Sequence, residues 1–232
     1  MNNHNIFRRE YDAYRTLLCK VPSLTLTLLV LSVVSMNLLA NKELVKTSWI
    51  ALDCGYALSW LPFLIMDCVC KAFGGKDATR LSILALVINL AFFALFKLIS
   101  LTPGMWGEYY STGMPQVNES LNRTIGGSSW IVFGSALAML VASVVNSITN
   151  TSIGKALHGD TYRTFAVRSF TSTMISQFAD NLVFALVVSI PLFGWSIRQS
   201  LVCAATCAFV EMLLEVCFSG IGYKICKNWC EK

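Results

Sequence analysis

Long apolar runs are the feature that most limits how this chain can fold. Of its 232 residues, 55% are hydrophobic and 13% are charged, whereas a soluble domain is usually about 25% charged. Several runs exceed the roughly 18 residues that an α-helix needs to cross the hydrocarbon core of a bilayer. A transmembrane β-barrel would instead alternate polar and apolar residues along short segments. The sequence therefore predicts an all-α, polytopic membrane protein.

Six transmembrane helices fit these runs. We predict them at residues 21–41, 48–71, 80–102, 129–154, 168–193 and 199–225. This prediction divides the chain into a cytoplasmic N-terminal segment, a six-helix transmembrane domain and a cytoplasmic tail, at residues 1–20, 21–227 and 228–232. The N-terminal segment is polar and basic, so we expect it to form a helix on anionic lipid or a loose tail.

The distribution of lysine and arginine predicts the orientation. With the N-terminus in the cytoplasm, thirteen basic residues lie on the inner side and four on the outer side. Basic residues collect on the cytoplasmic side of a membrane, so we predict that both termini are cytoplasmic and that the protein spans the plasma membrane. We attribute the net charge of +5 to this topology and predict no nucleic-acid partner.

Polar side chains interrupt the apolar runs at many positions. A charged side chain at the centre of a bilayer costs about 2.5–3.5 kcal/mol even on the mildest scale, so each one needs a partner, a cavity or a function. We interpret Asp53 and Lys97 as residues near the outer ends of their spans. The others that fall within spans are Asp67, Asn89, Ser143, Asn146, Ser147, Asn150, Gln177, Asp180, Asn181, Glu211 and Glu215.

Two of these spans place carboxylates at a similar depth. With a helical rise of about 1.5 Å per residue, Asp180 lies roughly 18 Å inward from Arg168, and Glu211 lies roughly 20 Å inward from Arg198. Asp180 shares a helical face with hydroxyl residues and has Gln177 beside it. The hydroxyl residues alone would suit close helix packing. The carboxylate with the amide predicts a polar pocket in mid-membrane, where the last two spans meet.

A second pair of carboxylates suggests proton coupling. Glu211 and Glu215 lie one turn apart on the last span, and two carboxylates so close repel each other if both are ionised. We therefore predict that one of them carries a proton during transport.

Enzymatic chemistry is poorly supplied. The chain has only two histidines, His4 and His158, and neither His-Glu-x-x-His nor Gly-x-Ser-x-Gly occurs. Most of the nine cysteines lie in apolar runs, where cysteine behaves as a small hydrophobe. We therefore predict no enzyme, no cofactor and no metal site, and favour a carrier for a small-molecule substrate.

Three segments stand out, in predicted spans five, two and one: "SFTSTMISQFADNLVF", "SWLPFLIMDCVCKAFGGKDATR" and "SVVSMNLLANKEL". They resemble the VUT family of queuosine-precursor transporters. The first is similar to the Ser-x-x-x-(Gly/Ser)-(Asn/Gln)-x-x-Asp-(Thr/Asn)-x-x-Phe signature of that family, the second to its second-span motif, and the third to its first span. The resemblance implies a six-helix inner-membrane importer of 7-deazaguanine bases.

The resemblance also implies a set of binding residues. Asn37, Asp67, Gln177 and Asp180 fall on motif positions, and Asn181 belongs to the same signature. Aromatic rings stack on flat solutes, so the aromatic residues expected to hold the base are Trp60, Phe63 or Phe184. The last span departs from the family pattern, which has a lysine and a later Pro-x-Tyr where this chain has Glu211, Ile221 and Tyr223.

Other membrane functions stay open at this point. The chain also fits the substrate-capture subunit of an energy-coupling-factor importer, although its first span is rich in leucine and lacks the small-residue face of those subunits. It also fits an importer of another vitamin-like molecule, or a scaffold without transport. We favour a carrier that works alone or as a homodimer.

Overall fold

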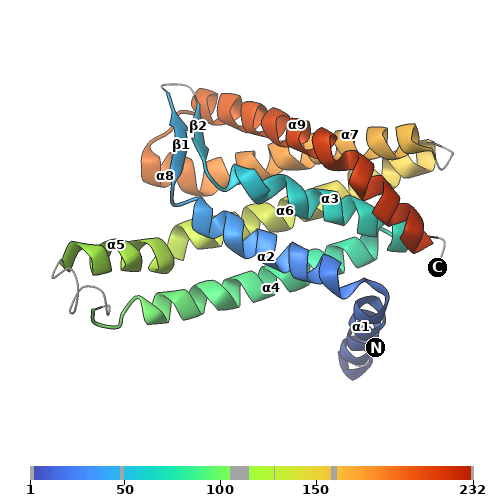
Figure 1. Cartoon of the computed structure of the whole chain (residues 1–232), viewed down its shortest axis with the longest axis horizontal. Helices are drawn as coiled ribbons and strands as arrows, with labels where there is room; N and C mark the ends of the chain where they lie inside the picture. Colours follow the sequence, from blue (N-terminus) through green and yellow to red (C-terminus); the bar gives the residue numbers. More distant parts are fainter. Residues whose placement is uncertain (1–2, 48–49, 105–114, 128, 158–160, 231–232) are drawn as a thin grey trace.

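The computed structural model describes residues 3–47, 50–104, 115–127, 129–157 and 161–230, and most of them are helical (Figure 1). In chain order the elements are α1 (Asn3–Lys20), α2 (Ser23–Leu39), β1 (Glu43–Lys46), β2 (Ala51–Asp53), α3 (Tyr56–Phe73), α4 (Gly75–Ile99), α5 (Pro115–Gly126), α6 (Ser129–Ala156), α7 (Tyr162–Phe184), the π-helical segment η2 (Ala185–Ser189), α8 (Ile190–Phe193) and α9 (Ile197–Cys230).

The prediction of a polytopic helical membrane protein is confirmed. Among the described residues, five helical stretches are long and apolar enough to cross a membrane, and they lie in α3, α4, α6, α7 with η2, and α9. Helices α1 and α2 pass the same test together but meet at 106°. Counting this bent pair as one span gives the six that the sequence predicts.

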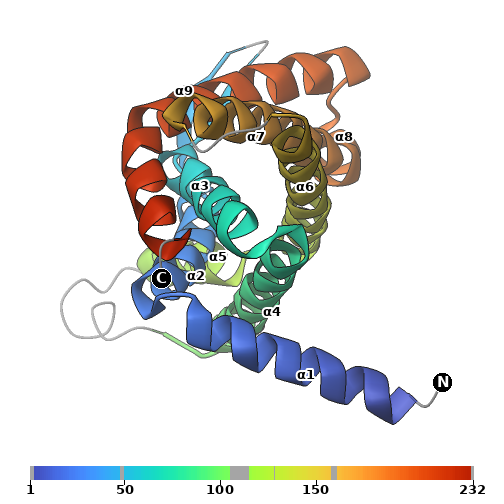
Figure 2. The same ribbon diagram turned by 90° about the vertical axis from the view of Figure 1, so that its right-hand side faces the viewer.

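Helix α3 lies at the centre of the bundle. It packs against α2, α4, α6, α7 and α9, and Figure 2 looks along the bundle and shows the last four arranged around it. In its most apolar 18-residue stretch, 56% of the residues of α3 are buried, against 22% for α4, whose stretch is the most apolar of the five. The more apolar helix is thus the less buried one. This is expected in a membrane, because an apolar helix surface is stable against lipid without being covered by protein.

Both described ends of the chain lie at one end of the bundle (Figure 1). The β1–β2 hairpin, α5 and α8 gather at the other end. Six crossings return a chain to the side where it started, so the position of the two ends agrees with the predicted number of spans.

The second predicted span, 48–71, is wrong at its beginning. Residues 51–53 of this span form β2, which pairs with β1 in an antiparallel hairpin, and the helix begins only at Tyr56. The cause is local: the Asp53 carboxylate accepts a hydrogen bond from the Gly55 amide at 2.7 Å, a turn that aspartate favours. Asp53 therefore belongs to the hairpin, not to the end of a membrane span.

The pH dependence of stability follows from this position. Burial raises the pKa of Asp53 to about 6, although the Gly55 hydrogen bond opposes the shift. The folded state therefore holds this proton more tightly than the unfolded chain. The stabilisation is complete below about pH 4 and is lost as the pH rises through about 6.

We expect Asp53→Asn to remove this dependence. Between pH 4.5 and 7 in detergent, the thermal midpoint of the wild-type protein should fall about 2–8 °C further than that of the variant, which corresponds to about 1–2 kcal/mol for a partly exposed group. Equal falls in the two proteins would contradict the buried position of this carboxylate.

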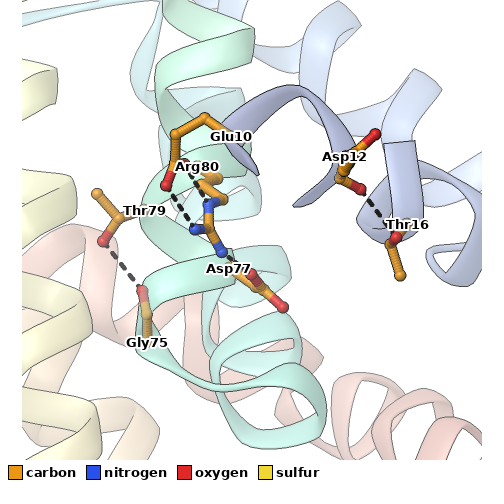
Figure 3. Close-up of polar contacts among 7 residues, drawn as sticks. All are labelled: Glu10, Asp12, Thr16, Gly75, Asp77, Thr79 and Arg80. Carbon is orange, nitrogen blue, oxygen red and sulfur yellow. Dashed lines mark hydrogen bonds and ion pairs between the residues drawn. The ribbon is translucent and has the colours of Figure 1, made fainter. Parts of the chain in front are cut away.

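Helix α1 is tied to the rest of the fold by an arginine of α4. Arg80 donates to both carboxylate oxygens of Glu10, at 3.0 and 3.2 Å, and to Asp77 at 2.7 Å (Figure 3). The N-terminal segment is therefore helical from Asn3 to Lys20, as one of the two expectations had it. Its contact with anionic lipid stays a prediction.

The fifth predicted span differs in both its beginning and its shape. It begins at Tyr162, where the Thr161 hydroxyl accepts a hydrogen bond from the Thr164 amide. It then passes into the π-helical segment at Ala185. Pro191 lies just beyond this segment and has no N–H to donate to the preceding turn, which favours an irregular helix there.

Candidate functional site

The carboxylate of Asp67 is the centre of a buried polar cluster. This residue has an exposed fraction of 0% and lies on the central helix α3. Its oxygen Oδ1 accepts hydrogen bonds from the amides of Asn146 and Asn150 on α6, at 2.8 and 2.9 Å. On α7, Ser169 donates to Oδ2 at 2.6 Å, and Ser172 lies 3.2 and 3.3 Å from the two oxygens. Asp67 thus joins three helices.

A positive charge reaches this cluster through an asparagine. The Arg168 guanidinium on α7 donates to Asn150 Oδ1 at 2.7 Å, while the amide nitrogen of Asn150 donates to Asp67. The Asn150 amide therefore accepts a hydrogen bond from Arg168 at its oxygen and donates one to Asp67 from its nitrogen. This polarised bridge stabilises an ionised Asp67 without a direct ion pair.

Helix α9 enters the cluster through Glu215. The Ser169 hydroxyl, which contacts Asp67, also makes a short hydrogen-bond contact with Glu215 Oε1. Thr173, one turn further along α7, lies beside both carboxyls. Ser169 and Thr173 belong to the polar stripe that the sequence identifies, and they bring the fifth and sixth predicted spans together.

A second polar group lies further along the same two helices. The Glu211 carboxyl on α9 lies beside the Asn181 amide and the Ser59 hydroxyl, within electrostatic reach of Asp180. The Tyr56 hydroxyl donates to Asn181 Oδ1 at 3.0 Å. Asp180 is half-buried and has no hydrogen-bond partner within the part of the chain that the structure describes.

Three buried polar atoms in this region have no partner among the described residues: Gln177 Nε2, Glu211 Oε2 and Glu215 Oε2. Their side chains are only 0–2% exposed. Gln177 lies one turn from Thr173, which meets Glu215, and one turn from Asn181, which meets Glu211. The amide therefore lies between the two carboxyls along the α7–α9 contact. Buried polar groups are rarely left unpaired, so one donor and two acceptors here mark a place for a polar ligand.

The other predicted binding residues have different surroundings. Asn37 on α2 accepts a hydrogen bond from Ser135 at 2.8 Å and donates to its own helix, so it links α2 to α6. The Trp60 ring stacks on Phe218 at 4.1 Å, and its indole N–H donates to Ala57. Phe184 is half-buried at the end of α7. Of the predicted binding residues, Gln177, Asp180 and Asn181 lie on α7, and Asp67 is hydrogen-bonded to serines of that helix. Trp60 instead stacks on Phe218.

Two cavities among the described residues lie away from this polar region. One, of about 520 Å³, includes Lys97, Glu119 and Arg123 in its lining. The other, of about 400 Å³, lies between α1 and α4 and includes Arg9, Asp12 and Arg80. Because Gln177, Glu211 and Glu215 are only 0–2% exposed, their unpaired atoms lie in a closed part of the bundle, and a ligand reaches them only if helices move apart.

Comparison with known proteins assigns the family. The sequence model of a family described as "putative vitamin uptake transporter" matches residues 53–229, about three quarters of the chain. The chain belongs to this family. No curated protein and no solved structure gives a significant match. The VUT match runs from α3 almost to the end of α9, so it contains every residue of the Asp67 cluster. The protein is a membrane importer of small molecules.

Sequence reasoning missed several members of the site. The sequence identifies Asn146 and Asn150 as polar residues within a span, but nothing in it shows that both donate to Asp67. Arg168 served only to mark the inner boundary of a span, and Tyr56 was not considered. The signal that could have found the asparagines is their position, because two amides one turn apart in an apolar helix need a buried polar partner.

Proposed function

We propose that this VUT protein imports a queuosine precursor, a 7-deazaguanine base, through a site between α7 and α9. In the same proposal it is a secondary transporter of the plasma membrane with both termini in the cytoplasm. The observation that carries the proposal is the set of unpaired atoms on Gln177, Glu211 and Glu215. The family match supports import of a small molecule, and these atoms suggest which one.

The unpaired atoms complement the edge of a guanine-like base. Such an edge offers a ring N–H and an exocyclic amine as donors, with a ring carbonyl as acceptor. A carboxylate accepts from two adjacent N–H groups, and a glutamine amide donates to a carbonyl. Glu211 would take the two donors, and Gln177 would take the carbonyl. A solute without this pattern would leave buried groups unpaired, which disfavours it strongly.

The remaining residues have supporting roles in this proposal. Asp180 is half-buried beside Glu211, so it suits the entry to the site. Phe184, one turn further, is the aromatic ring that we assign to stacking, because Trp60 is already paired with Phe218. Asp67 holds α3, α6 and α7 in place, and its motion would accompany opening.

Complementation tests the proposed substrate. The chain is expressed in a cell that cannot make 7-deazaguanines, the bases are supplied outside, and queuosine is measured in transfer RNA. We expect queuosine to appear with the wild-type chain. Its absence, with the protein shown to be inserted in the membrane, would exclude these bases as substrates. Rescue that required a separate ATPase module would show an energy-coupling-factor subunit instead of a carrier.

A further inference from the structure

We propose that the coupling ion of this transporter is a proton, held on Glu215 and passed through the Ser169 hydroxyl to Asp67. The inference rests on the transport function proposed above, but not on the identity of the substrate. Its basis is one juxtaposition: the Ser169 hydroxyl lies 2.6 Å from Asp67 Oδ2 and makes a short contact with Glu215 Oε1. A single hydroxyl thus lies between two buried carboxyls from α3 and α9.

The number of hydrogens decides which groups are ionised. A serine hydroxyl has one hydrogen to donate, while an ionised carboxyl can only accept. Ser169 therefore cannot donate to both carboxyls at once. One carboxyl must carry a proton and donate it to Ser169 Oγ, for otherwise two oxygens with lone pairs would face each other in a buried place.

The surroundings assign that proton to Glu215. Asp67 already accepts from the amides of Asn146 and Asn150, and these donors favour its ionised form. Ser169 then donates to Asp67, and the protonated Glu215 donates to Ser169. Glu215 has the Thr173 hydroxyl beside it but no amide donor, and its other oxygen is unpaired among the described residues.

The nearby charges act in the same direction. Asp67 and Cys68 of α3 lie within electrostatic reach of Glu215, and Glu211 lies one turn away on α9. The polar residues that α6 and α7 bring to the Asp67 cluster are uncharged apart from Arg168, which contacts Asn150. The Arg168 charge reaches Asp67 through Asn150. The Lys71 ammonium lies over the rings of Phe165 and Tyr223, 5.6 and 5.4 Å from their centroids. Arg168 thus supports a negative charge on Asp67, and Asp67 itself disfavours one on Glu215.

The transfer moves one proton and leaves the total charge unchanged. The Glu215 O–H bond breaks and its proton forms a new O–H bond with Ser169 Oγ. At the same time the original hydroxyl proton of Ser169 moves to Asp67 Oδ2. The products are an ionised Glu215 and a neutral Asp67. The second N–H of the exocyclic amine, placed at the unpaired oxygen of Glu215, would favour a negative charge there, so binding would drive the transfer. A neutral Asp67 holds α6 and α7 less tightly, which links the proton to helix opening.

Infrared spectroscopy tests the resting protonation without any substrate. The purified protein in detergent at pH 7 should show the carbonyl band of a protonated carboxyl, identified by its shift in heavy water. We expect Glu215→Gln to lose this contribution and Glu211→Gln to keep it. A band that Glu215→Gln leaves unchanged would overturn the assignment of the proton to Glu215.

Transport in vesicles tests the path. Two serine variants form a matched pair, because Ser169 contacts both carboxyls, whereas Ser82 on α4 is also buried but contacts only Met66 and Ala78. The readout is alkalinisation outside vesicles when a 7-deazaguanine is added. We expect Ser169→Ala to slow this proton movement about 10-fold, the effect of losing one hydrogen bond to a charged group, and Ser82→Ala to slow it less than 2-fold.

The outcomes separate this inference from the substrate assignment. Equal rates in the two serine variants, or uptake driven by a sodium gradient and indifferent to pH, would overturn the proton path. If no 7-deazaguanine enters vesicles but the infrared band behaves as expected, the substrate is wrong and the proton on Glu215 stands. If the bases enter but Glu215→Gln leaves the infrared band unchanged, the substrate assignment stands and the proton on Glu215 is wrong.

Discussion

Asp67→Ala should be the most destabilising single substitution among the polar residues of the bundle. The change removes three hydrogen bonds to a buried carboxylate, from Asn146, Asn150 and Ser169. Of these donors, Asn150 keeps its contact with Ser172 and Ser169 keeps its contact with Glu215. Each hydrogen bond to a charged group contributes about 1.5–3 kcal/mol, and the remaining contacts offset part of the loss, so we expect a total loss of about 3–5 kcal/mol. In detergent at a fixed scan rate this corresponds to a fall of roughly 10 °C in the unfolding midpoint.

Asp77→Ala is the matched control for this experiment. Asp77 is also an aspartate on a helix of the bundle, but it is partly exposed and pairs with Arg80 at 2.7 Å. A surface ion pair contributes about 0–1 kcal/mol, so the midpoint should move by no more than about 3 °C. If Asp67→Ala melts no lower than Asp77→Ala, the Asp67 cluster does not hold the bundle together.

Asp67→Asn separates the charge from the packing. The variant keeps the side-chain shape, but its amide presents a donor where the serines or asparagines also donate, so one contact must be lost. We expect a stability between those of the wild type and Asp67→Ala. The proton path predicts that this variant cannot accept a proton from Ser169, even where it folds.

The spans were predictable from the sequence because length and hydropathy act locally. Each helix that crosses the membrane must satisfy its own backbone, and an apolar run of sufficient length identifies it. The error at the beginning of the second span has the same origin: the run is apolar, but residues 51–53 form the second strand of a hairpin, and a turn at Asp53 and Gly55 separates it from α3. A hydropathy scale measures the free energy of transfer into lipid and contains no information on a local hydrogen bond such as the one between Asp53 and Gly55.

The partners of the buried carboxyls were not predictable in the same way. Helical periodicity places the polar residues of α7 on one face, and it places Glu211 and Glu215 on one face of α9. It does not show which neighbouring helix each of these faces contacts. The sequence shows Asp67 as one of several polar residues within spans, whereas the structure makes it the centre of contacts from α6 and α7. Such contacts depend on how six helices are arranged, and many arrangements suit the same hydropathy pattern.

Glu211→Gln should abolish high-affinity binding of a 7-deazaguanine. The carboxylate would accept from two donors of the base, and each hydrogen bond to a charged group contributes about 1.5–3 kcal/mol. An amide in its place accepts at one atom and presents a donor at the other, against a donor of the base. We therefore expect affinity to fall about 100-fold or more, measured by equilibrium binding to the purified protein. Glu119→Gln, on the exposed α5 beside Arg123, should bind as the wild type does.

The choice among bases distinguishes recognition from general damage to the site. Gln177→Leu removes the donor that we assign to the ring carbonyl and fills a similar volume. It should weaken binding of a 7-deazaguanine about 10-fold, yet leave unchanged the weak binding of an analogue without the carbonyl. Glu211→Gln should lose its effect on an analogue that lacks the exocyclic amine and the ring N–H. If both variants weaken every base equally, Gln177 and Glu211 support the fold of the site and do not read the base.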